Sequence, residues 1–272
     1  CVAGVIGVVL GGSRARGTHH ANSDIDIGIY YDVEAGFDVN QLSQVAAKLD
    51  DEHRENLVTP IGGWGPWVNA GGWLVVDGYH VDFILRDVRR VVAVIDDCLM
   101  GKVSTHYQAG HPHGYINVMY MGEVAVCAII SDPQGIIAEL KARTHPYPQI
   151  LKEAMVDYYM FEASFALMHA DHNVDKDDLS YVCGHAYRTI ACLNQVLFAL
   201  NEEYCINEKR AVSMIESFSV KPPQYKDGIE RAVSLLSKDP EKTRAGLFIL
   251  QDLVSKVEGL VQNHGGMLPQ DQ

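Results

Sequence analysis

The sequence predicts an α+β fold in two parts, a small mixed β-sheet with helices followed by an α-helical bundle. Short β-branched runs separated by glycine-rich turns fill the first half, and helical spacing of apolar residues fills the second. The change comes at Pro146 and Pro148. We therefore expect one domain over residues 1–145 and another over residues 146–272, each with its own core.

The first domain begins with two expected strands. Residues 5–10 are a β-branched apolar run that ends at Gly11 and Gly12, and residues 25–31 resume the strand pattern after a polar segment. Residues 13–20 between them have the composition of one or two helical turns. A helix is expected over residues 41–53, where apolar side chains keep a 3.6-residue period.

A segment rich in glycine and tryptophan leads from this helix to a predicted hairpin. Two short strands, residues 73–76 and 79–85, are joined by Asp77-Gly78, a strong signal for a two-residue β-turn. Trp64, Trp67 and Trp73 precede or begin the hairpin. They have two interpretations: stacking on a ring or cation of a ligand, or packing between the domains.

The second domain is expected to consist of helices alone. Helical spacing covers residues 150–172, 178–204, 208–218, 223–236 and 241–263, and the second of these carries a continuous apolar stripe. The aromatic residues of the first helix are expected in the core; they are Tyr158, Tyr159, Phe161 and Phe165. Glu162 among them is a candidate carboxylate for a cationic ligand.

The charge balance limits the classes of partner. With 22 Lys+Arg and 35 Asp+Glu the chain has a net charge of −13, which argues against a protein that coats nucleic acid. Small anions remain compatible, because metal ions and backbone N–H groups can hold them, and a cationic small molecule would be attracted. The longest apolar stretch is about ten residues, against the roughly 20 needed to span a bilayer, so we expect no membrane partner.

The cysteines suggest a reducing compartment. The six cysteines lie in apolar segments with no C-x-x-C pair, so we expect free thiols and a cytoplasmic protein. The sequence lacks an initiator Met, and we expect it to begin inside a longer chain.

Two aspartates mark the second strand as a candidate site. Asp24 and Asp26 are two positions apart, so in a strand both project from one face while Ile25 and Ile27 take the other. Adjacent carboxylates repel unless a cation lies between them, and hard divalent cations such as Mg²⁺ suit this donor set. The alternative is a solvated edge strand with two surface aspartates.

The turn after the first strand favours the ligand interpretation. Glycines let a phosphate approach the backbone closely, and Ser13 lies at an expected helix start. The turn is neither a Walker loop nor a G-x-G-x-x-G dinucleotide motif. Asp82 adds a third carboxylate, on the opposite face of its strand from Val81 and Phe83, and it can join Asp24 and Asp26 if the two strands are neighbours.

These motifs resemble the nucleotidyltransferase superfamily that includes DNA polymerase beta. Gly-Ser-Arg-Ala-Arg-Gly (residues 12–17), Ser-Asp-Ile-Asp (residues 23–26) and a third Asp on a later strand look like the aminoglycoside and lincosamide nucleotidyltransferases of bacteria. The resemblance covers residues 5–31 and 79–87 and is loose elsewhere. It implies a small catalytic sheet followed by helices, in agreement with the pattern above.

The resemblance also implies roles for individual residues. The catalytic set, which would also bind two Mg²⁺ ions, is Asp24, Asp26 and Asp82. The nucleotide-binding set, with ATP as the expected substrate, is Gly12, Ser13, Arg14, Arg16 and Ser23. Arg14 and Arg16 have an alternative interpretation as surface helix residues. The general base is either Asp82 or Glu123, an acid in an otherwise apolar helix.

The expected activity is transfer of AMP from ATP to a hydroxyl of a small, cationic acceptor, such as an aminoglycoside-like or lincosamide-like antibiotic, with release of pyrophosphate. The alternative is an antitoxin-like or regulatory transferase that adenylylates a protein. The loop at 105–115 contains His111 and His113 and is interpreted as lining the acceptor site, as a metal site or as a structural loop.

Overall fold

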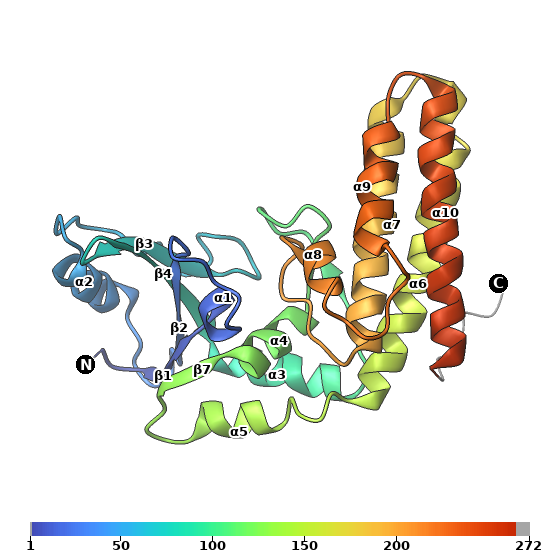
Figure 1. Ribbon diagram of the computed structural model, residues 1–272. Coiled ribbons are helices and arrows are strands. Elements are labelled where there is room, and N and C mark those ends of the chain that lie inside the picture. Colours follow the sequence, from blue (N-terminus) through green and yellow to red (C-terminus); the bar gives the residue numbers. More distant parts are fainter. Residues whose placement is uncertain (1, 265–272) are drawn as a thin grey trace. The chain divides into compact units, whose positions relative to one another are not determined.

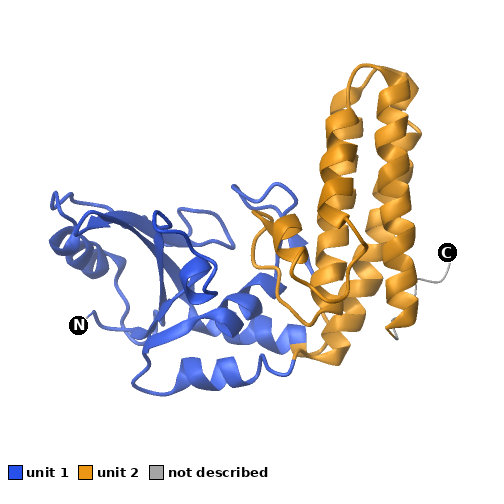
Figure 2. Cartoon of the chain, viewed as in Figure 1, with its two compact units in different colours: residues 1–98, 104–146 blue, residues 99–103, 147–272 orange. Residues whose placement is uncertain are grey.

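The computed structural model describes residues 2–264 and divides the chain into two compact units (Figure 2). The first comprises Cys1–Cys98 with Ser104–Pro146, and the second comprises Leu99–Val103 with Tyr147–Gln272. The first is a mixed α/β unit and the second is helical, so the predicted fold class is confirmed (Figure 1). No helix within residues 2–264 has the length and apolar character needed to cross a membrane.

The first unit is built on one five-stranded sheet in the order β3-β4-β2-β1-β7. β2 and β4 are parallel, and the other neighbouring pairs are antiparallel. Its strands are β1 (Val5–Leu10), β2 (Ile25–Tyr31), β3 (Ala70–Val76), β4 (Tyr79–Asp87) and β7 (Ala128–Ser131), and a separate pair consists of β5 (Thr105–His106) and β6 (Tyr115–Ile116). Its helices are α1 (Gly12–Ala15), α2 (Val39–Leu49), α3 (Val88–Leu99), α4 (Val118–Val126) and α5 (Ile136–Ala142).

The predicted hairpin is confirmed. Asp77 and Gly78 both have positive φ, 50° and 78°, the backbone that a two-residue turn between twisted strands requires. β3 begins three residues earlier than predicted and includes Gly71 and Gly72, because pairing with β4 continues to Ala70. β7, a four-residue exposed strand, was not predicted from the sequence.

One face of the sheet is a hydrophobic core. Ile29, Leu74 and Phe83 lie on this face and pack with Leu42 and Ala46 of α2. The helix begins at the N-cap Asp38, which accepts a hydrogen bond from the N–H of Asn40, and so starts two residues before the predicted position.

The opposite face is open at one end and covered at the other. Asp26 near the start of β2 and Asp82 in the middle of β4 are partly exposed, whereas Tyr30 and Arg86, four residues further along the same strands, are 2% and 3% exposed. The covered end contacts α4 through the ion pair of Arg86 with Glu123. The open end is therefore the part of this face that a ligand can reach.

The second unit contains α6 (Gln149–Asp171), the 3₁₀ turn η1 (Val174–Lys176), α7 (Leu179–Leu200), α8 (Ala211–Ile215), α9 (Tyr225–Leu235) and α10 (Pro240–Asn263). α6, α7 and α10 pack against one another, and α9 packs against α10 (Figure 1). The helix predicted over residues 208–218 is reduced to the five residues of α8.

The expectation that the four aromatic residues of α6 lie in the core was wrong for three of them. Tyr159 is fully buried, but Tyr158, Phe161 and Phe165 are 43%, 58% and 48% exposed. Burial of one stripe of a long helix leaves the residues on its other face outside, whatever their type. The five cysteines among the described residues are free thiols, in agreement with the sequence analysis, and Cys1 lies outside the described residues.

Candidate active site

The structure brings the three predicted carboxylates to one face of the sheet. β2 and β4 are parallel neighbours, and Asp26 pairs with Asp82 in their register. Asp24 precedes β2, two positions before Asp26. Neighbouring strands lie about 4.8 Å apart, so the alternation that turns Ile27 and Phe83 toward the core places the carboxylates on the opposite face.

Within this cluster, ionisation of Asp82 is disfavoured. The pKa of Asp82 is raised, first by partial burial and then by the negative charge of Asp24, while His80 acts in the opposite direction. Carboxylate oxygens are the ligands that hard divalent cations prefer, and the charge of such a cation would favour the ionised form of Asp82. The residues present therefore fit bound Mg²⁺.

Gly12 is fitted closely to Asp26. The N–H of Gly11 donates to the carbonyl of Asp26 at 2.8 Å, which fixes the turn after β1 beside the carboxylates. Gly12 has a φ of 58°, and a Cβ at this position would lie 1.7 Å from Oδ2 of Asp26. Only glycine leaves this space, and Ser13 follows directly in α1.

Arg14 and Ser23, predicted to bind nucleotide, hold the loop that precedes β2. The guanidinium of Arg14 donates to the carbonyl of Ser23 at 2.8 Å and to that of Asp24 at 3.2 Å. Ser23 closes a turn with His20, whose N–H donates to Oγ of Ser23 at 2.9 Å. Arg16 follows α1, and its N–H donates to the carbonyl of Gly12 at 3.3 Å. Nucleotide binding by these residues stays a prediction.

Glu123, the second candidate base, is engaged in an ion pair. Its two carboxylate oxygens accept hydrogen bonds from Nε and Nη2 of Arg86, both at 2.7 Å. Arg86 also donates to the carbonyl of Val68 at 2.7 Å. The pair lies at the covered end of the face, so the geometry favours Asp82 over Glu123 as the base. An Arg in the apolar run of β4, two positions from Ile84, is the sequence signal that could have found this pair.

Two of the three tryptophans lie beside the carboxylates. Trp73 pairs with Asp82 between β3 and β4, and the ring of Trp64 stacks on that of Trp73 with centroids 4.8 Å apart. Trp67 differs, because it is buried and stacks on His106 at 4.2 Å, with the guanidinium of Arg90 4.2 Å from its ring centroid. Trp67 is therefore a core residue of the first unit.

The loop at 105–115 supports the tryptophan segment. Gln108 is 2% exposed, and its Oε1 accepts hydrogen bonds from the N–H groups of Trp67 and Val68, each at 3.1 Å. Its Nε2 donates to the carbonyl of Trp64 at 2.5 Å. The structural interpretation of this loop is therefore supported, and Gln108 is a residue that the sequence analysis did not single out.

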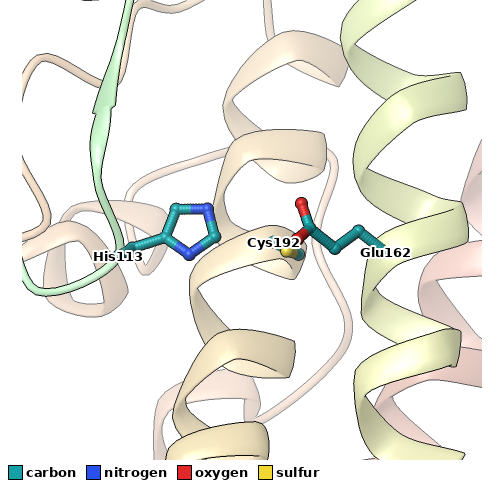
Figure 3. Close-up of side chains that lie close together, drawn as sticks. All are labelled: His113, Glu162 and Cys192. Carbon is teal, nitrogen blue, oxygen red and sulfur yellow. The ribbon is translucent and has the colours of Figure 1, made fainter. Parts of the chain in front are cut away.

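Figure 3 draws His113 together with Glu162 and Cys192. His113 belongs to the first unit, whereas Glu162 of α6 and Cys192 of α7 belong to the helical unit. Within the helical unit, Glu162 accepts a hydrogen bond from Arg188. Burial followed by the charge of Glu162 raises the pKa of Cys192 well above its usual range.

Comparison with known proteins identifies the kind of domain that contains these residues. Residues 2–62 match the family model of the nucleotidyltransferase domain, and this range contains β1, the Gly12-Ser13 turn, Asp24 and Asp26. The chain thus carries a nucleotidyltransferase domain of the predicted superfamily and is an enzyme of the nucleotidyltransferase type.

Among solved structures, the chain is similar to a nucleotidyltransferase-like protein from Exiguobacterium sibiricum 255-15. The TM-score is 0.46 and the identity 9%, with 96% of this chain and 72% of that chain covered. No curated protein matches the sequence.

Proposed function

We propose that this enzyme transfers AMP from ATP to a hydroxyl group of a small cationic acceptor, in a Mg²⁺-dependent reaction that releases pyrophosphate. The observation that carries the proposal is the register of β2 and β4, which pairs Asp26 with Asp82 and leaves Asp24 two positions away. Crowded carboxylates of this kind destabilise a fold unless they bind a cation. An aminoglycoside-like or lincosamide-like antibiotic is the acceptor class, in keeping with the net charge of −13.

The proposed roles of the chain's own residues follow from their positions. Asp24, Asp26 and Asp82 would hold Mg²⁺, which when bound supplies an acidified acceptor hydroxyl and neutralises charge on the phosphates. Gly12 and Ser13 would bind the triphosphate at the end of β1. Arg14 would keep Asp24 in place through its two hydrogen bonds to the loop.

In the transfer step, the acceptor oxygen forms a bond to the α-phosphorus and the bond from that phosphorus to the pyrophosphate oxygen breaks. The hydroxyl proton passes to the carboxylate of Asp82, and pyrophosphate leaves with the electron pair. The contribution of the protein is positioning and charge stabilisation, as in other phosphoryl transfer sites.

The direct test is the double variant Asp24→Asn/Asp26→Asn. We expect it to lose nucleotide transfer and the rise in Tm that Mg²⁺ plus ATP gives the native protein, without a lower Tm of its own, since it removes two crowded charges. The matched control is Asp171→Asn/Asp227→Asn, which removes two exposed aspartates from the helical unit. Retained transfer in the first variant would refute the metal assignment.

The acceptor and the nucleotide are identified by one screen. The protein is incubated with Mg²⁺, each of the four ribonucleoside triphosphates and a panel of hydroxyl-bearing antibiotics, and mass spectrometry detects the added nucleotidyl group. We expect AMP on a small molecule. AMP on a protein from a cell extract, with no small molecule modified, would support the alternative of a protein-modifying transferase.

A further inference from the structure

The strand order determines the side from which an acceptor approaches, if the proposed function holds. Gly12 and Ser13 follow β1, whereas Asp82 lies on β4, on the other side of β2, and β3 comes next. In an in-line displacement at phosphorus, the attacking oxygen enters opposite the leaving group. With the triphosphate at Gly12 and Ser13, pyrophosphate leaves toward β1, and the acceptor must approach over β4 and β3.

An exposed aromatic surface lies at this position. Trp73 of β3 pairs with Asp82, so both side chains project from the same face, and the side chain of Trp73 is 64% exposed. Trp64 stacks on it with an interplanar angle of 28°. We call these two residues the tryptophan platform.

Contacts with the strand backbone and with Gln108 fix the position of the tryptophan platform. A Cβ on Gly71 would lie 2.2 Å from the ring of Trp64, so the indole packs directly on the strand backbone. The N–H of Trp64 donates to the carbonyl of Asn69 at 2.8 Å, and its carbonyl accepts from the buried amide of Gln108. These contacts fix an aromatic surface before any ligand is present, which lowers the entropic cost of binding.

We propose that the tryptophan platform binds the acceptor through the flat face of a saturated, hydroxyl-bearing ring, a sugar or an aminocyclitol. A ring that stacks on Trp73 lies next to Asp82, so the reacting hydroxyl must be attached to that ring or one bond away from it. Amino groups on the ring gain from the indole faces and from the nearby carboxylates, which favours a cationic ring. This inference rests on the proposed function and assigns the residues that bind the acceptor at the same site.

The test measures ligand binding by isothermal titration calorimetry, with kanamycin, streptomycin and lincomycin as ring-bearing probes and spermine as a linear polyamine without a ring. We expect Trp73→Ala to weaken binding of at least one ring-bearing probe by about tenfold or more and to weaken binding of spermine clearly less, because spermine has no ring face to stack. Trp73→Phe should restore part of the affinity. With the acceptor identified, the same variant should raise the KM for the acceptor and leave the KM for ATP unchanged.

The matched control is Tyr79→Ala. Tyr79 is 57% exposed on the same hairpin, but its position in β4 differs from that of Asp82 by an odd number of residues, so it takes the opposite face. We expect wild-type affinity for every probe. An equal loss in the Tyr79 and Trp73 variants would overturn the proposal.

The remaining outcomes separate this inference from the proposed function. If Trp73→Ala weakens the response to ATP but not to the ring-bearing probes, the platform binds the nucleobase and the inference is wrong while nucleotide transfer stands. If no ring-bearing probe shows binding that depends on Trp73, the inference is also wrong. If the native protein transfers no nucleotide in the screen above, the proposed function fails, and if the carboxylate variants keep transfer, the metal assignment fails, whatever the tryptophan variants do.

Discussion

The substitution Gly12→Ala tests whether the turn after β1 and the carboxylate cluster work as one site. Gly12 has a positive φ, and the added methyl group would lie 1.7 Å from Oδ2 of Asp26. Because backbone hydrogen bonds fix the turn to β2, the carboxylate of Asp26 must move away from the added methyl group. The variant therefore displaces a candidate metal ligand without changing its chemistry.

The size of the effect follows from two contributions. The left-handed backbone costs an alanine about 1 kcal/mol of stability relative to glycine. A Cβ contact shorter than 3.0 Å is not tolerated, so Oδ2 of Asp26 must move by about 1.3 Å. A displacement of about 1 Å at a reacting centre can reduce the rate about 100-fold. We therefore expect a small loss of stability and a loss of about 100-fold in kcat/KM.

Gly17→Ala is the matched control for this experiment. Gly17 has a φ of 72°, and nothing lies within 4 Å of a Cβ at that position. It has the same backbone cost but does not contact Asp26. The assay compares the urea midpoints of both variants, their rise in Tm with Mg²⁺ and ATP, and their transfer rates with the identified acceptor. Equal stability and equal activity of the two variants would refute the reasoning.

Three further predictions concern neighbouring parts of the first unit. Glu123→Gln should lower the free energy of unfolding, measured with urea, by about 2–3 kcal/mol, because it leaves Arg86 buried without its charged partner. The variant should keep kcat. Unchanged stability with lost turnover would instead make Glu123 the base. The pKa of Asp50 is lowered, first by the side-chain hydrogen bond from Arg54, so its contribution to stability is present above about pH 4 and is lost as the pH falls below that value. Between pH 7 and pH 3, the urea midpoint should fall less for Asp50→Asn than for the native chain. An equal fall of the midpoint in both proteins would contradict this prediction. Arg14→Ala should lower kcat more than it raises the KM for ATP, because Arg14 holds the loop before β2; a change confined to the KM would indicate phosphate binding.

The elements of the catalytic half could be predicted where local signals are strong. The apolar run of β1, the alternation in β2 and the Asp-Gly turn are local patterns, and each gave the element that the structure has. β7 was missed because its local signal is only two β-branched residues, and its pairing with β1 joins segments more than 100 residues apart. Strand order depends on such long-range pairing, which composition and periodicity do not encode.

The candidate site illustrates the same division between local and long-range information. The spacing of Asp24 and Asp26 establishes that both lie on one face, since alternation is a local property of a strand. That Asp82 joins them depends on β4 lying beside β2 in parallel register. The stack of Trp64 on Trp73 depends in addition on the loop that Gln108 holds, and no spacing in the sequence indicates it.

Two charged residues on the same face of β4, Asp82 and Arg86, differ in how their charges are balanced. Asp82 and Arg86 project from β4 on the same side, four residues apart. Arg86 is buried and bound by both oxygens of Glu123, which neutralises it within the protein. Asp82 is partly exposed, and its pKa is raised first by partial burial and then by the negative charge of Asp24. The charge of Arg86 is thus satisfied by folding alone, whereas that of Asp82 has no such partner in an ion pair within residues 2–264, and this difference supports our proposal that the open end of the sheet binds the metal ion.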